Sequence, residues 1–255
     1  MSPRRKYLLL GAAAVVLILI IVLGIRLFAN RADDHGPRPD QALPGTVLLV
    51  PGYGGSRSAL TRLAERLSAT GRTTQVLTLP GEGTGDLLAQ VETLNAAVRA
   101  VLRNGAPSVD VIGYSAGGVV TRLWVDRDHG AESARRIVTL GSPLHGAKIA
   151  GLGAALAPDA CPQACRELAP GSDLLDSIDK PLPAGLPWLS IWTTDDETVQ
   201  PPDSARQAGA VNLPLQSICP SAQVSHSDLP TNPQIEALVV RALGTGPLTE
   251  PTTCP

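Results

Sequence analysis

Short apolar runs rich in β-branched residues recur along the chain, and stretches of helical hydrophobic spacing separate them. The runs predict strands over residues 46–50, 75–79, 109–112, 136–140, 188–192 and 211–215. The intervening spacing predicts helices over residues 56–70, with Ser56 as its N-cap, 86–103, 118–125 and 235–243. Strands that alternate with helices indicate an α/β fold, a mostly parallel central sheet with helices on both faces.

The amino-terminal residues follow a different pattern. Arg4, Arg5 and Lys6 precede an uncharged apolar run over residues 7–25. This run approaches the roughly 20 residues that a membrane-spanning helix needs and exceeds the apolar part of most signal peptides. The preceding positive charges place the amino terminus inside and residues 31–255 outside. We therefore expect residues 1–30 to be a retained signal anchor that contacts the membrane through residues 7–25. A cleaved signal peptide, and hence a secreted protein, is the alternative, and a buried soluble helix is the third.

Composition narrows the class of protein further. Residues 31–45 are polar, contain Pro37 and Pro39, and are expected to form a linker, so that one folded domain occupies residues 46–255. The formal net charge is −2. The chain therefore has no basic surface of the kind that binds nucleic acid, and we expect no nucleic-acid partner.

Four cysteines lie in the part of the chain expected outside the cell, where an even number predicts two disulfides. Three pairings are possible. We favour Cys161 with Cys165, which closes a small loop, and Cys219 with Cys254, which fastens the end of the chain. Four free buried thiols are the alternative. A zinc site is less well supported, because the C-x3-C spacing lacks a second pair of ligands.

The segment Gly113-Tyr114-Ser115-Ala116-Gly117 reads G-x-S-x-G and falls between a predicted strand and a predicted helix. A tight strand-turn-helix connection exposes a serine hydroxyl, and small flanking residues allow backbones to pass closely. The helix that follows directs its first N–H groups toward the same point, which suits a developing oxyanion. Ser115 is therefore the candidate nucleophile.

A serine nucleophile needs a base and a carboxylate that orients the base. His226 follows the last predicted strand and precedes the last helix, so it is the candidate base. The other histidines lie in the linker, in a charged helix end or too early in the chain: His35, His129 and His145. The carboxylate is expected directly after the strand over residues 188–192, where Asp195 and Asp196 compete and Glu197 is a more distant candidate.

Together these segments resemble the α/β-hydrolase superfamily, and within it the secreted lipases and esterases of bacteria, of actinobacterial type. The resemblance covers residues 46–243. It is carried by Val50-Pro51-Gly52-Tyr53-Gly54-Gly55, by Gly113–Gly117, by Gly141-Ser142-Pro143-Leu144-His145-Gly146 and by the D-x-x-V turn Asp196–Val199. That last match favours Asp196 over Asp195. The resemblance implies oxyanion-hole donors at the backbone N–H groups of Tyr53 and Ala116, and no metal or organic cofactor.

Many members of that group carry His-Gly where this chain has Pro51-Gly52, but the implied donors are backbone groups, so activity should be retained. Residues 144–186 are the natural cap or substrate loop, and Leu144 and His145 are expected to line the site. Asp173, Asp176 and Asp179 suggest calcium, but their spacing after Ser172 fits an exposed helix better.

The resemblance implies that residues 46–255 are a catalytic domain that hydrolyses lipid-like carboxylic esters through an acyl-enzyme. Its expected partners are a small ester or lipid substrate and the membrane. An acyltransferase of the same fold and a catalytically inactive binding module at the cell surface are the alternatives.

Overall fold

The computed structural model describes residues 17, 20–21 and 38–255. The predicted signal segment over residues 1–30 and the first part of the predicted linker lie outside the described residues, apart from Leu17, Ile20 and Ile21. Among the residues that are described, no helix combines the length and the apolar character that crossing a membrane requires. Residues 38–255 form one compact unit.

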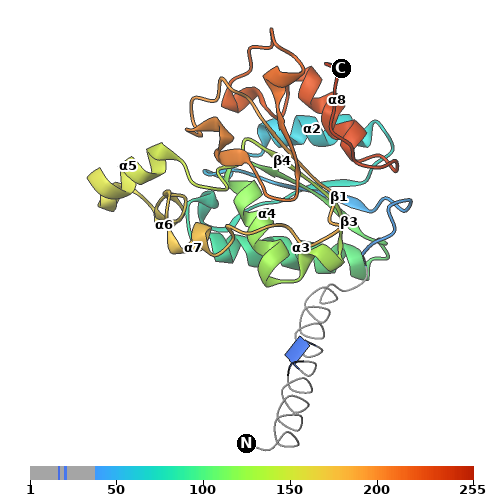
Figure 1. Ribbon diagram of the computed structural model, residues 1–255, viewed down its shortest axis with the longest axis horizontal. Helices are drawn as coiled ribbons and strands as arrows, with labels where there is room; N and C mark the ends of the chain where they lie inside the picture. Colours follow the sequence, from blue (N-terminus) through green and yellow to red (C-terminus); the bar gives the residue numbers. More distant parts are fainter. Residues whose placement is uncertain (1–16, 18–19, 22–37) are drawn as a thin grey trace, which may run out of the picture. The chain divides into compact units, whose positions relative to one another are not determined.

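The core of this unit is a six-stranded sheet in which every neighbouring pair of strands is parallel. The strand order is β2-β1-β3-β4-β5-β6 (Figure 1). The bounds of the strands are Thr46–Val50 for β1, Thr74–Val76 for β2, Val109–Tyr114 for β3, Ala134–Leu140 for β4, Trp188–Trp192 for β5 and Val211–Pro214 for β6. The predicted parallel sheet is thereby confirmed.

Helices cover both faces of the sheet, as predicted. Helix α3 (Leu87–Arg103) and helix α4 (Ala116–Arg127) pack on one face, while α2 (Ser58–Ser68) and α8 (Pro233–Ala242) pack on the other (Figure 1). Along β1, Leu48 and Val50 belong to the first of these cores, and Val47 and Leu49 belong to the second. Because side chains alternate along a strand and both faces are covered, β1 reads as a continuous apolar run.

The structure corrects several details of the predicted elements. Ser56 does not cap a helix: α2 begins at Ser58, its N-cap is Arg57, and that residue makes no side-chain capping hydrogen bond. The second strand is shorter than predicted and ends at Val76, and a short 3-10 helix, Pro80–Gly83, follows it. Asp86 does cap α3, since its carboxylate accepts a hydrogen bond from the backbone N–H of Leu88 at 2.7 Å.

Three α-helices and one short 3-10 helix, Pro158–Ala160, occupy residues 144–186, where the sequence shows no strand pattern. The α-helices are α5 (Lys148–Leu156), α6 (Gln163–Glu167) and α7 (Asp173–Asp176). Ser172 caps α7 by accepting a hydrogen bond from the N–H of Leu175 at 3.3 Å. The three aspartates that suggested calcium are all exposed, but α7 is shorter than the helix expected for them: it holds Asp173 and Asp176, and Asp179 lies beyond its end.

Two disulfides form with the favoured pairing, Cys161–Cys165 and Cys219–Cys254. The second disulfide fastens the irregular residues 244–255 to the domain. Residues 38–45 were expected to belong to a linker, but they also contact the domain. The Gln41 side chain donates a hydrogen bond to the carbonyl oxygen of Arg135 at 3.1 Å.

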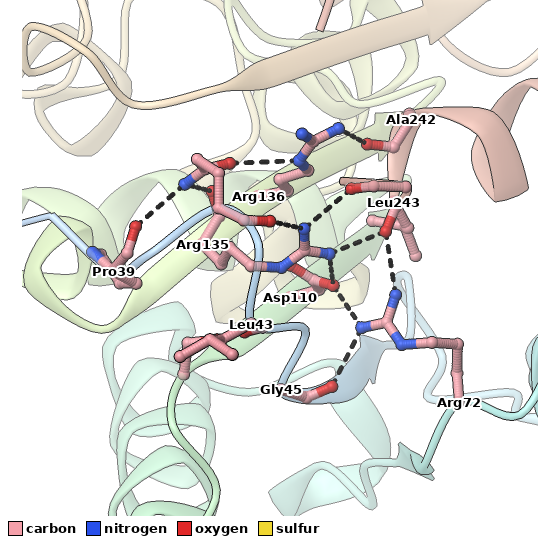
Figure 2. A network of polar contacts seen from close by, with 12 residues as sticks. Pro39, Leu43, Gly45, Arg72, Asp110, Arg135, Arg136, Ala242 and Leu243 are labelled. Atoms are coloured by element: carbon pink, nitrogen blue, oxygen red, sulfur yellow. Dashed lines mark hydrogen bonds and ion pairs between the residues drawn. The ribbon is translucent and has the colours of Figure 1, made fainter. Parts of the chain in front are cut away.

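A buried polar network lies at the amino-terminal end of β3, opposite the end that carries Ser115 (Figure 2). The Asp110 carboxylate is fully buried and accepts hydrogen bonds from Arg72 and from Arg135, the latter at 2.5 Å. Both guanidinium groups also donate to the carbonyl oxygen of Leu243, at 3.0 Å from Arg72 and 2.7 Å from Arg135. One carboxylate therefore compensates two cations that together bind the carboxyl end of α8.

Arg136 extends this network by donating to the carbonyl oxygen of Ala242 at 2.6 Å (Figure 2). Burial lowers the pKa of Arg136, and the nearby charge of Arg135 lowers it further. The last carbonyl groups of a helix lack intrahelical partners and carry partial negative charge, so cationic donors are stabilising there. The network thus joins β3, β4 and α8.

We predict that Asp110→Asn lowers the free energy of unfolding by about 3 kcal/mol, because it removes the charge that compensates the buried guanidinium group of Arg135 and the partly buried one of Arg72. Urea denaturation at neutral pH measures the change. Asp176→Asn is the matched control, since Asp176 is exposed, and we expect it to change stability by less than about 0.5 kcal/mol. Equal stability of the two variants would contradict this account of the network.

Candidate active site

The candidate residues gather at the carboxyl edge of the sheet. The chain passes from β1 to β2 on one side of β1 and then returns to β3 on its other side. The loops after β1 and β3 therefore leave in different directions and open a crevice, the usual place for a site in open parallel sheets. Ser115 follows β3 directly, and the segment Pro51–Gly55 follows β1.

Ser115 occupies a strained turn between β3 and α4. Its backbone angles are φ 51° and ψ −125°, a region that residues with a Cβ rarely adopt. Its N–H donates to the carbonyl oxygen of Leu140 at 2.8 Å, and its carbonyl oxygen accepts from Gly118 at 3.0 Å. A Cβ at Gly113 would lie 2.5 Å from the Cα of Gly118, and one at Gly117 would lie 2.2 Å from the carbonyl oxygen of Val50. The G-x-S-x-G spacing is therefore required by close backbone contacts.

His226 joins Ser115 to Asp196. The Ser115 hydroxyl and the Nε2 atom of His226 are 2.9 Å apart, and the Nδ1 atom of His226 lies 2.6 Å from Oδ2 of Asp196. With the proton on Nδ1, His226 donates to the carboxylate and accepts from the hydroxyl. His226 is 6% exposed and Asp196 is 1% exposed, so water does not compete for these contacts.

The two neighbouring aspartates are clearly distinguished by their surroundings. Asp196 Oδ1 accepts hydrogen bonds from the backbone N–H groups of Thr198 at 2.9 Å and Val199 at 2.7 Å, which fix the carboxylate toward His226. Asp195 is exposed, and its carboxylate lies 3.4 Å from the side-chain nitrogen of Gln216. Of the two, the structure brings Asp196 to the imidazole.

Two further side chains hold the backbone of His226. Glu197, the distant candidate for the acid, accepts a hydrogen bond from the N–H of His226 at 3.1 Å. The hydroxyl of Tyr114 donates to the carbonyl oxygen of His226 at 3.2 Å, and the two rings are 5.3 Å apart. Burial, followed by the charges of Asp196, Glu197 and Asp228, raises the pKa of Tyr114 to about 12. The phenol therefore remains a donor at neutral pH.

The loop after β1 approaches the serine closely. A Cβ at Gly52 would lie 2.9 Å from the Cβ of Ser115, so this position admits no side chain. Tyr53 follows Gly52 and lines the same pocket as Ser115. Ala116 is the first residue of α4, where backbone N–H groups have no partner within the helix. Tyr53 and Ala116 therefore flank the serine from two elements.

A pocket of about 240 Å³ opens beside Ser115 and Tyr53. Apart from these residues its walls are mostly aliphatic and come from α5, the segment before it, the end of α6 and the loop after β5: Ala147, Ile149, Ala150, Leu168 and Val199. It is somewhat smaller than the roughly 300–1,000 Å³ usual for sites that enclose drug-sized ligands. The pocket favours a short or medium apolar group.

Comparisons with known proteins agree with this architecture. A family model described as a PGAP1-like alpha/beta domain matches residues 79–152, which is less than half of the chain. The structure of Bacillus licheniformis lipase BlEst2 in its mature form superposes with a TM-score of 0.67 at 19% sequence identity. The match covers 82% of this chain and 96% of that one. No curated protein matches the chain by sequence.

Aspergillus fumigatus lipase B is similar to the same extent, with a TM-score of 0.66 and 20% identity over 83% of this chain. The matched region spans 54% of lipase B, so the chain corresponds to about half of that protein. This chain has the α/β-hydrolase fold. At these identities the likeness establishes the fold alone.

Two predicted lining residues lie away from the pocket beside Ser115. Leu144 is buried in the core on the α3 and α4 face. His145 lines a separate depression, where its Nδ1 atom lies 3.0 Å from the carbonyl oxygen of Ser204 and its Nε2 atom 3.4 Å from Asp179. The prediction that these two residues line the site is therefore not supported by their positions.

Several residues around the candidate site were not assigned a role from the sequence. Ile149 and Ala150 line the pocket from α5, and Tyr114 and Glu197 hold His226. Tyr114 is the variable position of the G-x-S-x-G motif, so the motif itself gives no signal for it. In α5 the only sequence signal is the presence of large apolar residues within the expected cap, and the structure leaves three of them exposed: Ile149, Leu152 and Leu156.

We predict that Tyr114 titrates near pH 12 in the folded protein and near pH 10 after unfolding. Because the folded pKa is the higher one, the contribution of Tyr114 to stability is complete below about pH 10 and is lost as the pH rises toward about 12. Tyrosinate absorbance after a rapid pH jump, with Tyr114→Phe subtracted from the wild type, measures this ionisation. The same midpoint in folded and denatured protein would show that the site does not shift the phenol.

Proposed function

We propose that this protein is a serine hydrolase that cleaves carboxylic esters of lipid-like substrates, as lipases and esterases do. The observation that carries the proposal is the hydrogen-bonded chain from the Ser115 hydroxyl through His226 to the buried Asp196 carboxylate, at 2.9 Å and 2.6 Å. This order of nucleophile, base and orienting acid is the arrangement that acyl transfer requires. The PGAP1-like segment and the likeness to lipase structures support it.

In the proposed reaction, the Ser115 oxygen attacks the carbonyl carbon of the ester and His226 Nε2 takes the hydroxyl proton. Asp196 keeps the other imidazole proton on Nδ1 and stabilises the imidazolium that forms. The backbone N–H groups of Tyr53 and Ala116 receive the oxyanion, at about 3 kcal/mol for each donor. His226 then protonates the departing alkoxide, and water releases the acyl group from Ser115 by the same steps.

The apolar walls of the pocket beside Ser115 suit the acyl part of the substrate. Apolar groups are stabilised there by about 0.8 kcal/mol for each buried CH₂ group. We therefore assign this pocket to the acyl chain, and its small volume to short or medium chains.

We also propose that the catalytic domain lies outside the cytoplasm. The two disulfides are compatible with an oxidising compartment. The arginines and lysine before the apolar run over residues 7–25 support an anchor with residues 31–255 outside.

We predict that Ser115→Ala lowers kcat for p-nitrophenyl butyrate by about 10⁴-fold or more, because the acyl-enzyme can no longer form. A spectrophotometric assay of the purified full-length protein measures this. Undiminished turnover in the variant, or an inactive wild type, would refute the hydrolase. Preferential transfer of the acyl group to an added alcohol instead of water would favour the acyltransferase.

Asp196→Asn is expected to lower kcat by about 10⁴-fold, because an amide no longer stabilises the imidazolium or selects its tautomer. Asp195→Asn is the matched control: the same change one residue earlier, at an exposed position, should leave kcat within about twofold. If the two variants lose activity to the same extent, the carboxylate has been assigned to the wrong residue or the whole loop is disturbed.

A further inference from the structure

Helix α5 forms one wall of the pocket beside Ser115, yet its two ends are held very differently. Its first turn supplies Ile149 and Ala150 to the pocket. The chain just before this turn is fixed by backbone hydrogen bonds, from Ala147 to the carbonyl oxygen of Leu168 at 3.0 Å and from Lys148 to that of Gln200 at 2.9 Å. The far end of the helix is exposed, with Leu156 79% accessible to solvent.

The Cys161–Cys165 disulfide contacts α5 between its fixed and its exposed end. A Cβ at Gly153 would lie 3.2 Å from Sγ of Cys165 and 3.5 Å from Sγ of Cys161, so the disulfide packs directly against the middle of α5. Cys165 itself lines the pocket beside Ser115. Figure 1 shows α5 and α6 next to each other at the margin of the domain, away from α2 and α8.

Helix α6, which carries Cys165, is anchored firmly to the body of the domain. The N–H of Ala164 donates to the carbonyl oxygen of Thr84 at 3.1 Å, and Ala164 is fully buried. The Glu167 carboxylate accepts from the N–H of Leu87, at the start of α3, at 2.9 Å. The disulfide thus joins α6 to the segment that leads into it from α5, and its sulfur atoms pack against α5.

The two disulfides differ in how much they restrict the unfolded chain. Cys161 and Cys165 are four residues apart, whereas Cys219 and Cys254 are 35 apart. The loss of entropy that a cross-link imposes on the unfolded chain grows with the length of the loop. The short loop therefore contributes less to global stability, and its main effect is on local geometry.

We propose that the Cys161–Cys165 disulfide is a positioning element that holds α5 as a wall of the acyl pocket and thereby sets the preference for acyl-chain length. This inference rests on the proposed ester hydrolysis and deepens it. An acetyl group does not extend along α5, whereas a longer chain is buried against Ile149 and Ala150. Without the disulfide, the longer chain loses this contact, while Ser115, His226 and Asp196 remain in place on other elements.

The test compares two single substitutions, each of which breaks one disulfide and leaves one thiol: Cys161→Ser and Cys219→Ser. Purified full-length protein is assayed with p-nitrophenyl acetate and p-nitrophenyl hexanoate. For Cys161→Ser we expect the ratio of kcat/KM for hexanoate over acetate to fall by about tenfold, through a higher KM for hexanoate. For Cys219→Ser we expect that ratio to stay within about twofold of the wild type, and the melting temperature to fall more than in Cys161→Ser.

Gly153→Val provides a second variant in which both disulfides stay intact. Its branched side chain does not fit between α5 and the sulfur atoms, so the helix is displaced and the ratio should fall in the same direction. Retained hydrolysis of acetate shows that each variant is folded. An unchanged ratio in Cys161→Ser, or an equal fall in Cys219→Ser, would overturn the positioning role alone. Failure of the wild type to hydrolyse either ester would overturn the proposed function together with this inference.

Discussion

The parallel direction of the six strands is the constraint on which the candidate site depends. Because the strands are parallel, each loop that follows a strand emerges at the same edge of the sheet. Ser115 follows β3, Asp196 follows β5 and His226 comes after β6, so residues separated by up to 111 positions meet within hydrogen-bond distance. The helices that cover both faces exclude water from the sheet, and this burial gives the two hydrogen bonds their strength.

The opposite edge of the sheet is stabilised by buried charge. Asp110 lies near the start of β3, and Ser115 directly follows the end of the same strand. The arginines around Asp110 bind carbonyl oxygens at the end of α8 and in the residues beyond it. The stabilising ion pairs therefore lie at one end of β3, and the strained turn at Ser115 lies at the other. The strained backbone of that turn costs stability, as it often does at candidate functional sites.

Much of this fold could be predicted from the sequence, for physical reasons that are specific to each element. A strand buried on both faces must be apolar throughout, so the runs around Val47 and Ile137 are visible without a structure. Helix α5 was not predicted, because its glycines and alanines resemble a loop and its apolar side chains are partly exposed. The N-cap expected at Ser56 failed because a cap depends on the local backbone, which hydrophobic spacing does not report. The position expected for His145 rested on the family resemblance, and here the side chain lies beside Ser204 and Asp179 instead.

The sequence by itself determined the order of strands and helices, the serine motif and the candidate base, because burial and backbone crowding restrict which residues can occupy those positions. The D-x-x-V match already favoured Asp196 over Asp195, and the tertiary structure added the geometry, in which the Asp196 carboxylate meets the imidazole. It also identified the wall of the pocket. That wall is formed by α5, and a disulfide packs against α5 at Gly153. The sequence does not show these contacts, because they form only when the folded chain packs the two segments together.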